Sequence, residues 1–472
     1  MGRLIVVSNR TPTKGPAAGG LAVALSNTLA EREGFWFGWS GKLVEKPSRE
    51  AVFENIDGIE VGKIDLTRDD HQAYYSGFSN SILWPSFHLR LALATIEGHW
   101  YEGYRRVNAQ FAAALKPHLR ADDVVWVHDY HLIPLAAELR RLGARNRIGF
   151  YLHIPFPTVD AFYAVPHNDE LMRDLSYYNL VGMQAERDVG AFQEFADHRS
   201  PAMLSDRPAE AFDFSDTEVA AFPIGSDPDA FARLSVSPAA TKLAKRMKRM
   251  LGDQSLILGV DRLDYSKGLP QRVEAYERLL ANNTSLRRRV HLLQVAPPSR
   301  DTIKEYQEIS NTLDAMVGRV MGHFAEPDWQ PLTYVKRAYG QPSLAGMYRL
   351  ARVGLVTPLR DGMNLVAHEY VGSQDPEDPG VLVLSRFAGA AEIFGDALLV
   401  NPFDTSETAE ALRLALAMGL DERKQRWQQL HAAARRYSVG NWAKSFLDHL
   451  LPRRNASGSG VSASPLDLHP AA

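Results

Sequence analysis

The sequence predicts an α/β protein built from two doubly wound parallel-sheet domains that face a common cleft. Its 472 residues exceed what one ordinary domain core buries, so two domains are expected. Short runs of apolar, often β-branched residues recur along the chain, with helical stretches between them. Polar or charged side chains follow most of these runs directly. They would stand at the carboxyl ends of parallel strands, where α/β sheets bind their ligands.

The composition excludes several classes of function. Hydrophobic residues make up 45% of the chain and charged residues 23%, with a formal net charge of -3. This balance argues against a broad surface for nucleic acid or anionic membrane. The absence of cysteine rules out disulfides, thiolate metal sites and cysteine nucleophiles, and it fits a cytoplasmic location. No apolar run approaches the roughly 20 residues of a membrane-spanning helix, and the first run is too short for a signal peptide.

The first predicted strand, Leu4–Val7, leads directly into Ser8-Asn9-Arg10. A loop follows, and Gly19-Gly20 then opens a helical stretch. After the first strand of an α/β domain, two glycines can let the backbone approach a phosphate closely. Alternatively, the two glycines simply mark the start of the helix. Arg10 and the glycine pair are therefore candidate ligand contacts.

Two aromatic groups follow in the first half of the chain. Most of the rings in residues 35–41 are expected in the core, while Trp39, between two glycines, is the one expected to face a ligand. The second group contains Tyr75 and Trp84. Aromatic platforms suit the apolar C–H faces of sugars, although rings of this kind are more often part of a core.

Two further strands in this half end in histidine and aspartate. Residues 124–127 precede His128-Asp129-Tyr130-His131, and residues 148–152 precede His153. Arg10, Asp129 and His153 would therefore line one crevice. His128, Asp129 and His131 could instead hold a metal, but a histidine and aspartate at a strand end also suit sugar hydroxyls, and we favour that alternative.

Loss of periodicity and turn chemistry define the expected domain limits. Residues 196–215 are predicted to form a surface loop, and residues 222–228 a linker. The first domain is then 1–228 and the second 229–438. An amphipathic helix at 439–452 is expected to reach back toward the first domain. The tail 453–472, rich in Ser, Gly and Pro, has little to bury and is expected to be disordered.

The second domain opens with a strand at 256–260 whose following loop holds Arg262 and Lys267. An arginine fork and a lysine point charge in one strand-to-helix loop make a good diphosphate clamp. The alternative is that both cations pair locally with Asp261 and Asp264. Arg300, after the next predicted strand, is another candidate anion contact.

The stretch from Thr357 to Tyr370 is the strongest candidate site in this domain. A strand at 353–356 is followed by a turn at Asp361-Gly362 and a helix that begins near Asn364. A helix N-terminus favours an anion, and the flanking carboxylates Asp361 and Glu369 can accept sugar hydroxyls. Alone, this would be an ordinary turn with a capping aspartate. With the cations of the neighbouring strand ends, it predicts a nucleotide-sugar site.

Eight motifs between about residue 3 and about residue 450 occur in the order found in one known family. Together they resemble the trehalose-6-phosphate synthases, retaining glycosyltransferases of family 20 with the GT-B fold of two Rossmann-like domains. The motifs are Ser8–Arg10, Gly19–Ala22, Trp36–Gly41, Leu83–Pro85, His128–Leu132, His153–Pro157, Asp261–Gly268 and Arg360–Leu365.

The resemblance implies transfer of glucose from UDP-glucose to glucose 6-phosphate, giving α,α-trehalose 6-phosphate and UDP, with no cofactor and no metal. It assigns catalysis to Arg262, Lys267, Asp361 and His153. It assigns donor binding to these cations and Asp361 with Gly19, Gly20, Met363, Asn364, Leu365, Val366 and Glu369. It assigns acceptor binding to Arg10, Trp39, Tyr75, Trp84, Asp129 and Arg300.

The resemblance also sets expectations about partners. No phosphatase motif follows the second domain, so a separate trehalose-6-phosphate phosphatase is expected to act downstream, and a homo-oligomer, either dimer or tetramer, is expected. The chain departs from the family pattern in a short loop at 11–18, a short segment after Gly41, Ser226 in place of an apolar residue, and His368 where lysine is frequent. The last departure leaves the preferred base of the donor open.

Two other hypotheses remain at this point. One is a related transferase that uses GDP-glucose or ADP-glucose, or another phosphorylated acceptor such as glycerol 3-phosphate. The other, from a different class, is a catalytically silent sensor of sugar phosphates. The complete set of donor candidates argues against the sensor.

Overall fold

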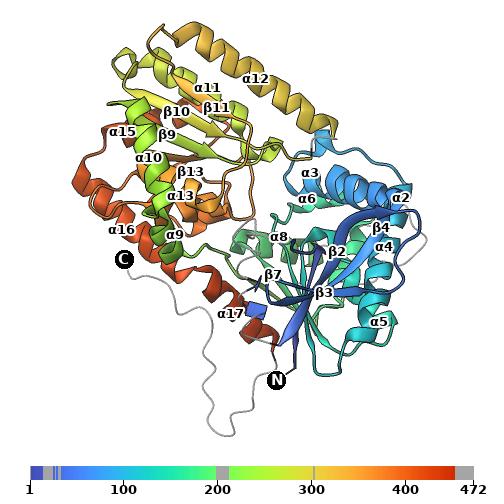
Figure 1. The fold of residues 1–472 in the computed structure, drawn as a ribbon. Helices are drawn as coiled ribbons and strands as arrows, with labels where there is room; N and C mark the ends of the chain where they lie inside the picture. The colour runs from blue at the N-terminus through green and yellow to red at the C-terminus, as the bar shows by residue number, and fades with distance from the viewer. Residues whose placement is uncertain are drawn as a thin grey trace.

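The computed structural model describes residues 2–13, 25–26, 28–29, 33–197, 212–300 and 303–451. These residues form two lobes, one blue to teal and one green to orange in Figure 1. The Gly19-Gly20 pair, most of the predicted 196–215 loop and the predicted disordered tail lie outside the described residues. The predicted class, two doubly wound α/β units, is confirmed.

The first lobe contains an eight-stranded sheet in the order β3-β4-β2-β1-β5-β6-β7-β8. Only β3 is antiparallel to its neighbour. The predicted first strand was too short, because Ser8, Asn9 and Arg10 continue it. The strands are β1 Leu4–Arg10, β2 Gly34–Val44, β3 Val52–Ile56, β4 Ile59–Thr67, β5 Val124–His128, β6 Arg147–Tyr151, β7 Leu180–Met183 and β8 Glu218–Ala221.

The helices of this lobe include a π-helix that the sequence does not predict. It spans twelve residues and carries Tyr75. Such helices are rare and are often found at functional sites. The helical elements are α2 Arg68–His71, η1 Gln72–Leu83, α3 Trp84–Phe87, η2 Leu91–Leu93, α4 His99–Leu115, η3 Lys116–His118, η4 Tyr130–Leu132, α5 Leu135–Arg141, α6 Val159–Tyr163, α7 Asn168–Leu175 and α8 Glu186–Asp197.

The second lobe contains a six-stranded, wholly parallel sheet in the order β11-β10-β9-β12-β13-β14. Its four inner strands are almost wholly buried and rich in Val, Ile and Leu, as expected for a sheet covered on both faces. The strands of the sheet are β9 Ser255–Val260, β10 Val290–Val295, β11 Leu332–Val335, β12 Val353–Val356, β13 Val381–Ser385 and β14 Leu398–Val400.

Helices cover both faces of this second sheet, and α12 lies along its outer side in Figure 1. The helical elements are α9 Pro228–Ser235, α10 Pro238–Leu251, η5 Tyr265–Lys267, α11 Leu269–Asn282, η6 Thr284–Leu286, α12 Lys304–Phe324, α13 Gln341–Leu350, α14 Leu365–Ser373, η7 Gly389–Glu392, α15 Thr405–Ala417 and α16 Leu420–Arg436. Within the described residues, no helix is long and apolar enough to cross a membrane.

The final helix, α17 (Val439–Leu450), packs beneath the first sheet rather than the second. The Phe446 ring stacks on Trp126 of β5 with centroids 4.6 Å apart. Gly149 and Gly182 make room for it, since a Cβ on either would lie within 3.0 Å of the Phe446 ring. Figure 1 shows α16 and α17, in red, running from one lobe to the other. The domain limits at 228, 438 and 452 stay a prediction.

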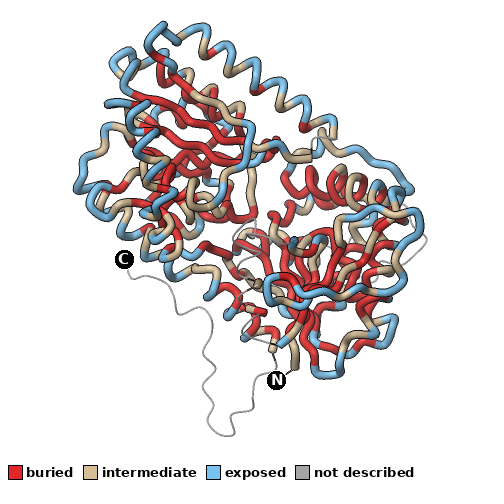
Figure 2. Tube along the Cα trace, in the orientation of Figure 1, coloured by how far each residue is buried: buried red, intermediate tan, exposed pale blue. Residues whose placement is uncertain are grey.

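Buried residues form a separate layer in each lobe, as Figure 2 shows in red. A further hydrophobic cluster joins the two lobes. It contains Trp126 and Phe222 from the first, Tyr370 and Leu382 from the second, and Phe446 from α17. The lobes therefore share part of one core along the side opposite the exposed surface of α12.

Candidate active site

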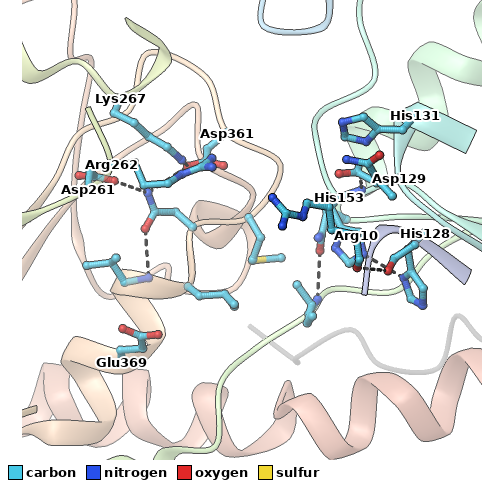
Figure 3. A pocket seen from close by; sticks show the side chains of 18 residues that line it. Arg10, His128, Asp129, His131, His153, Asp261, Arg262, Lys267, Asp361 and Glu369 are labelled. Carbon is cyan, nitrogen blue, oxygen red and sulfur yellow. Dashed lines mark hydrogen bonds and ion pairs between the residues drawn. The ribbon is translucent and has the colours of Figure 1, made fainter. Parts of the chain in front are cut away.

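A cavity of about 450 Å³ lies where the carboxyl ends of the two sheets face each other. Figure 3 shows Lys267, Asp361 and Glu369 on one side, and Arg10, Asp129 and His131 on the other. The lining residues are Ser8, Asn9, Arg10, His128, Asp129, His131, His153, Gln184, Ile224, Asp261, Arg262, Lys267, Asp361, Met363, Asn364, Leu365, Val366 and Glu369.

The start of α14 is built as a helix N-terminus that faces this cavity. Asn364, not Asp361, is the capping residue: it has a left-handed φ of 82°, and its side chain accepts from the Val366 N–H. Asp361 is free of the capping role. Its Oδ2 accepts from Lys267 Nζ at 2.5 Å and from Asn364 Nδ2 at 3.0 Å. The sequence does not predict this Lys267–Asp361 ion pair.

Two arginines from one stretch of the second lobe have opposite environments. Arg272, on α11, is fully buried and donates to Asp261 at 2.8 Å and to Thr357 at 3.1 Å. Arg262 is exposed, and among the described residues it makes no hydrogen bond or ion pair. Its guanidinium lies 5.9 Å from the Trp84 ring. Arg262 therefore remains available to an anion.

The hypothesis that the loop cations pair with Asp261 and Asp264 is wrong. Asp261 pairs with Arg272, and the nearest cation to Asp264 is Arg300, at 3.5 Å. Lys267 pairs with Asp361 instead. The two aspartates thus pair with arginines outside the loop, and neither forms an ion pair with Arg262.

Glu369, one turn into α14, lines the far end of the same wall. Tyr348 of α13 donates to its Oε2 at 3.1 Å. Burial raises the pKa of Glu369 to about 7, and the hydrogen bond from Tyr348 opposes that rise. The carboxyl group is therefore poised between its two protonation states near neutral pH.

The wall formed by the first lobe carries Asp129 and His153. Asp129 has a left-handed φ of 78° and accepts from the His153 N–H at 3.2 Å. Burial raises its pKa to about 6, against the opposing effect of backbone N–H groups. The His153 Nε2 lies 3.0 Å from His128 Nδ1. Burial lowers the pKa of His153 to about 3, so its ring is neutral at ordinary pH.

The arrangement of the histidines does not favour the metal alternative. His128 is engaged with His153, and the His131 ring stacks on Tyr75 with an interplanar angle of 10°. Within the described residues there is no group of three or more His, Cys, Asp or Glu side chains that could hold a metal. Asp129 itself lines the cavity.

The remaining predicted acceptor residues form a cluster of rings and cations that adjoins the cavity. Arg10 lines the cavity and stacks on Trp39 at 5.0 Å, and the Trp39 and Tyr75 rings are 6.3 Å apart. Arg300 stacks on Trp84 at 3.9 Å. Of the six predicted acceptor residues, Arg10 and Asp129 line the cavity, whereas Trp39, Tyr75, Trp84 and Arg300 stand behind its lining.

Trp39, singled out as a residue facing a ligand, is only 4% exposed. Its indole Nε1 donates to the Lys42 carbonyl oxygen at 2.9 Å. Flanking glycines are therefore a poor guide to exposure here, because β2 buries this ring against α2 and η1. In this structure Trp39 positions Arg10 through its face.

Two residues that depart from the family pattern meet near the linker. His368 is fully buried against Phe394, and a Cβ on Gly225 would lie 3.1 Å from its Nδ1. The Ser226 hydroxyl is buried next along the chain. Neither side chain has a hydrogen-bond partner among the described residues. His368 does not line the cavity.

Several residues of the site have no signal in the sequence. Gln184 and Ile224 line the cavity from the ends of β7 and the linker, and Tyr348 reaches Glu369 from α13. Each stands in an ordinary apolar or helical stretch. Only the packing of elements distant in sequence brings them to the site.

Comparison with known families decides the relationship. The profile of glycosyltransferase family 20 matches residues 7–451. The chain belongs to this family. The match covers both lobes and every candidate site residue of the cavity, so the predicted relationship is confirmed.

Three relatives illustrate the similarity. Trehalose-6-phosphate synthase of Sodalis glossinidius is 46% identical over 455 residues, which cover 95% of this chain and 96% of that one. A Burkholderia xenovorans trehalose-phosphate synthase (UDP-forming), solved in complex with glucose-6-phosphate, is 46% identical with a TM-score of 0.88 and covers 95% and 100% of the chains. An E. coli structure bound with UDP-2-fluoro glucose is 42% identical with a TM-score of 0.89, covering 95% and 99%. These likenesses confirm the GT-B architecture.

Proposed function

We propose that this glycosyltransferase moves glucose from UDP-glucose to glucose 6-phosphate with retention of configuration, releasing α,α-trehalose 6-phosphate and UDP. One observation carries the proposal. One wall of a single cavity carries the N-terminus of α14 together with Arg262 and Lys267. The opposite wall carries Asp129 and Arg10. That is the pattern a diphosphate-linked sugar and a phosphorylated sugar require. Relatives that align with 95% of the chain at 46% identity carry the corresponding name.

The donor belongs on the wall of the second lobe. Arg262, Lys267 and the backbone N–H groups at the start of α14, from Met363 to Val366, neutralise the diphosphate. Asp361 accepts hydroxyls of the glucose, and Glu369 accepts those of the ribose. Gly19 and Gly20 would complete the diphosphate contacts.

The acceptor belongs on the wall of the first lobe, to which Arg300 of the second lobe is joined through Tyr130. Arg10 and Arg300 supply the positive charge for its phosphate. Both are held against aromatic rings, Arg10 by Trp39 and Arg300 by Trp84. Tyr75 joins them through its ring contacts, and Asp129 accepts sugar hydroxyls. A cation held by rings is preorganised, so little of its side-chain freedom is lost on binding.

The reaction breaks the bond between the glucose C1 and the diphosphate oxygen and forms one between that C1 and the acceptor O1. The departing phosphate oxygen takes the acceptor's proton on the same face. Retaining glycosidases place a second carboxylate about 5 Å from the first as a nucleophile. Here Asp361 is engaged by Lys267, so catalysis rests on stabilising the charge that develops on the diphosphate. His153, neutral beside the donor glucose, positions the reacting carbon.

The test is UDP release measured with purified protein, UDP-glucose and glucose 6-phosphate. We expect release only when both substrates are present, with a phosphorylated, non-reducing disaccharide as the product. A protein that binds both ligands and releases no UDP would be a sugar-phosphate sensor. Replacing the donor by GDP-glucose or ADP-glucose, and the acceptor by glycerol 3-phosphate, separates the remaining alternatives.

Three further statements accompany this proposal. The product leaves phosphorylated, so a separate phosphatase consumes it. The protein acts in the cytoplasm, in keeping with a chain without cysteine. It forms a homo-oligomer, a dimer or a tetramer, which light scattering of the purified chain at assay concentration would decide.

A further inference from the structure

The loop that carries Asp361 touches the opposite lobe through its neighbour, Arg360. The Arg360 Nη2 donates to the Phe156 carbonyl oxygen at 2.7 Å. The same nitrogen lies 3.8 Å from Asp188 Oδ1, on the first turn of α8. The two side chains are 16% and 1% exposed. An ion pair between the lobes therefore stands directly beside the candidate donor site.

This ion pair is incompletely formed. Asp188 Oδ1 accepts from the Phe156 N–H at 3.2 Å, but its Oδ2 is buried without a hydrogen-bond partner among the described residues, and so is the Arg360 Nε. Leaving such groups buried and unpaired is unfavourable, and more so when they are charged. Arginine and carboxylate prefer a contact with two parallel hydrogen bonds. In this structure that two-bond contact is absent, and Arg360 Nη2 makes its hydrogen bond to Phe156 instead.

A second arginine reinforces the same junction. Arg187, the neighbour of Asp188, donates to the Phe387 carbonyl oxygen at 3.3 Å, and that oxygen also accepts from the Asp361 N–H at 3.2 Å. Arg187 lies 3.6 Å from Glu392. Burial raises the pKa of Asp188 to about 7, while Arg360 and Arg187 oppose that rise. The carboxylate thus depends on both arginines for its charge.

The backbone of the two lobes is in direct contact at the next residue. A Cβ on Gly362 would lie 2.4 Å from the His153 carbonyl oxygen. Only a glycine allows this approach without displacing the chain. The loop of Asp361 is therefore pressed against the loop of His153, and Arg360 fixes the contact from one side.

We propose that Arg360 is a positioning residue which, with Asp188 and the Phe156 carbonyl, joins the Asp361 loop to the His153 loop. The proposal rests on the proposed function. Asp361 and His153 come from different lobes, so the geometry around the donor glucose depends on this junction. A shift of about 1 Å in such a contact can cost on the order of 10²-fold in rate. A closed junction also keeps water from the donor.

The experiment compares Arg360→Lys and Asp188→Asn with the wild type at saturating UDP-glucose and glucose 6-phosphate. We expect kcat to fall about 10- to 100-fold, with KM for glucose 6-phosphate changed less than about twofold. UDP release without acceptor should rise relative to transfer, because an open junction admits water. Arg413→Lys is the matched control, since its exposed ion pair with Glu410 lies on α15 away from the cavity.

The double variant tests whether the two side chains act together. If the two side chains form one contact, the double variant should lose as much kcat as the more damaging single variant. If they act independently, the fold-losses of the two single variants should multiply in the double variant. Variants with wild-type kcat and wild-type partition between hydrolysis and transfer overturn the inference. So does an equal loss of hydrolysis and transfer, which marks a structural role only. A wild-type protein that releases no UDP contradicts the proposed function instead.

Discussion

The two walls of the cavity hold their cations in different ways. On the donor wall, Lys267 is tied to Asp361 by an ion pair, and the loop beneath it rests on the buried Asp261–Arg272 pair. On the acceptor wall, Arg10 and Arg300 lie over the indole rings of Trp39 and Trp84. Lys267 is thus balanced by a carboxylate, whereas Arg10 is supported by an aromatic face. Arg300 has both kinds of support, because it also lies 3.5 Å from Asp264.

The difference teaches what each wall must do. On the proposed function, the donor wall carries the leaving group, whose charge grows during the reaction, and the ion pair with Asp361 keeps Lys267 in place as that happens. The acceptor phosphate keeps its charge throughout. The Trp39 ring holds Arg10 without neutralising it, so the full positive charge of Arg10 is left for the ligand. The comparison predicts that substitutions which remove a charge impair the donor wall most. Substitutions which change the shape of an aromatic side chain should impair the acceptor wall most.

The largest effect is expected when the two arginines of the donor wall are exchanged for methionine. Arg272→Met leaves the Asp261 carboxylate buried without its partner, and the free energy of unfolding should fall by about 3–5 kcal/mol. Arg262→Met removes an exposed charge, and stability should stay within about 0.5 kcal/mol. Its turnover should nevertheless fall by about 10²-fold. Denaturant unfolding and UDP release measure the two quantities.

The affinity for glucose 6-phosphate is a control for the Arg262→Met variant. Glucose 6-phosphate should bind Arg262→Met about as tightly as the wild type, because that arginine belongs to the donor wall. Equal loss of stability in both variants would erase the distinction between scaffold and site. Unchanged turnover in Arg262→Met would remove this residue from the diphosphate clamp.

A smaller effect is expected from the acceptor wall. The Tyr75 ring lies between those of His71 and His131, with centroids 5.1 and 5.7 Å away. Tyr75→Leu removes both ring contacts and should raise KM for glucose 6-phosphate about tenfold, which corresponds to about 1.4 kcal/mol. Tyr75→Phe keeps the ring, so a comparable rise in that variant would show that the hydroxyl, and not the shape of the wall, is what matters.

The smallest effect concerns the pH dependence of donor binding. Because burial raises the pKa of Glu369 to about 7, the carboxyl group is protonated below that pH and accepts ribose hydroxyls less well. KM for UDP-glucose should therefore rise a few-fold as the pH falls through about 7. Glu369→Gln should show a high KM that no longer changes over this range. Initial rates at varied UDP-glucose concentration across the same pH range are the measurement.

Tyr348→Phe sharpens this prediction. The Tyr348 hydroxyl lowers the pKa of Glu369 through its hydrogen bond, so its removal should move the inflection to higher pH. The same linkage affects folding. Since the raised pKa lets the folded state keep a proton that the unfolded chain has lost, stability should fall as the pH rises toward 7, and Glu369→Gln should lose that dependence.

Much of the donor wall could be predicted from the sequence because its parts are local. Strand, turn and helix start follow one another within residues 353–369, and Arg262 and Lys267 share one loop. Local order determines where their side chains emerge. The sequence did not predict which of the neighbouring charged residues would form buried structural ion pairs. Arg272 is eleven residues from Asp261 along the chain and reads as an exposed helical arginine.

The acceptor wall shows the limit of such prediction. The sequence placed Trp39 and Tyr75 in separate aromatic groups, whereas the structure brings their rings to within 6.3 Å of each other. This contact depends on a π-helix for which the sequence has no signal. Tyr130 and Tyr306 hold Arg300 through hydroxyl contacts that join both lobes. Contacts between side chains so distant in sequence follow from tertiary packing, and periodicity does not report them.

The position of α17 has a consequence for the synthesis of the protein. Phe446 fills the space beneath β6 and β7 that Gly149 and Gly182 leave open, so the first lobe buries one face of its sheet with residues made last. At about 5–20 residues per second, the ribosome needs on the order of tens of seconds to pass from β8 to α17. During that interval Trp126 and Phe222 lack their partner. The packing of this face of the first lobe is therefore completed only when α17 has been made.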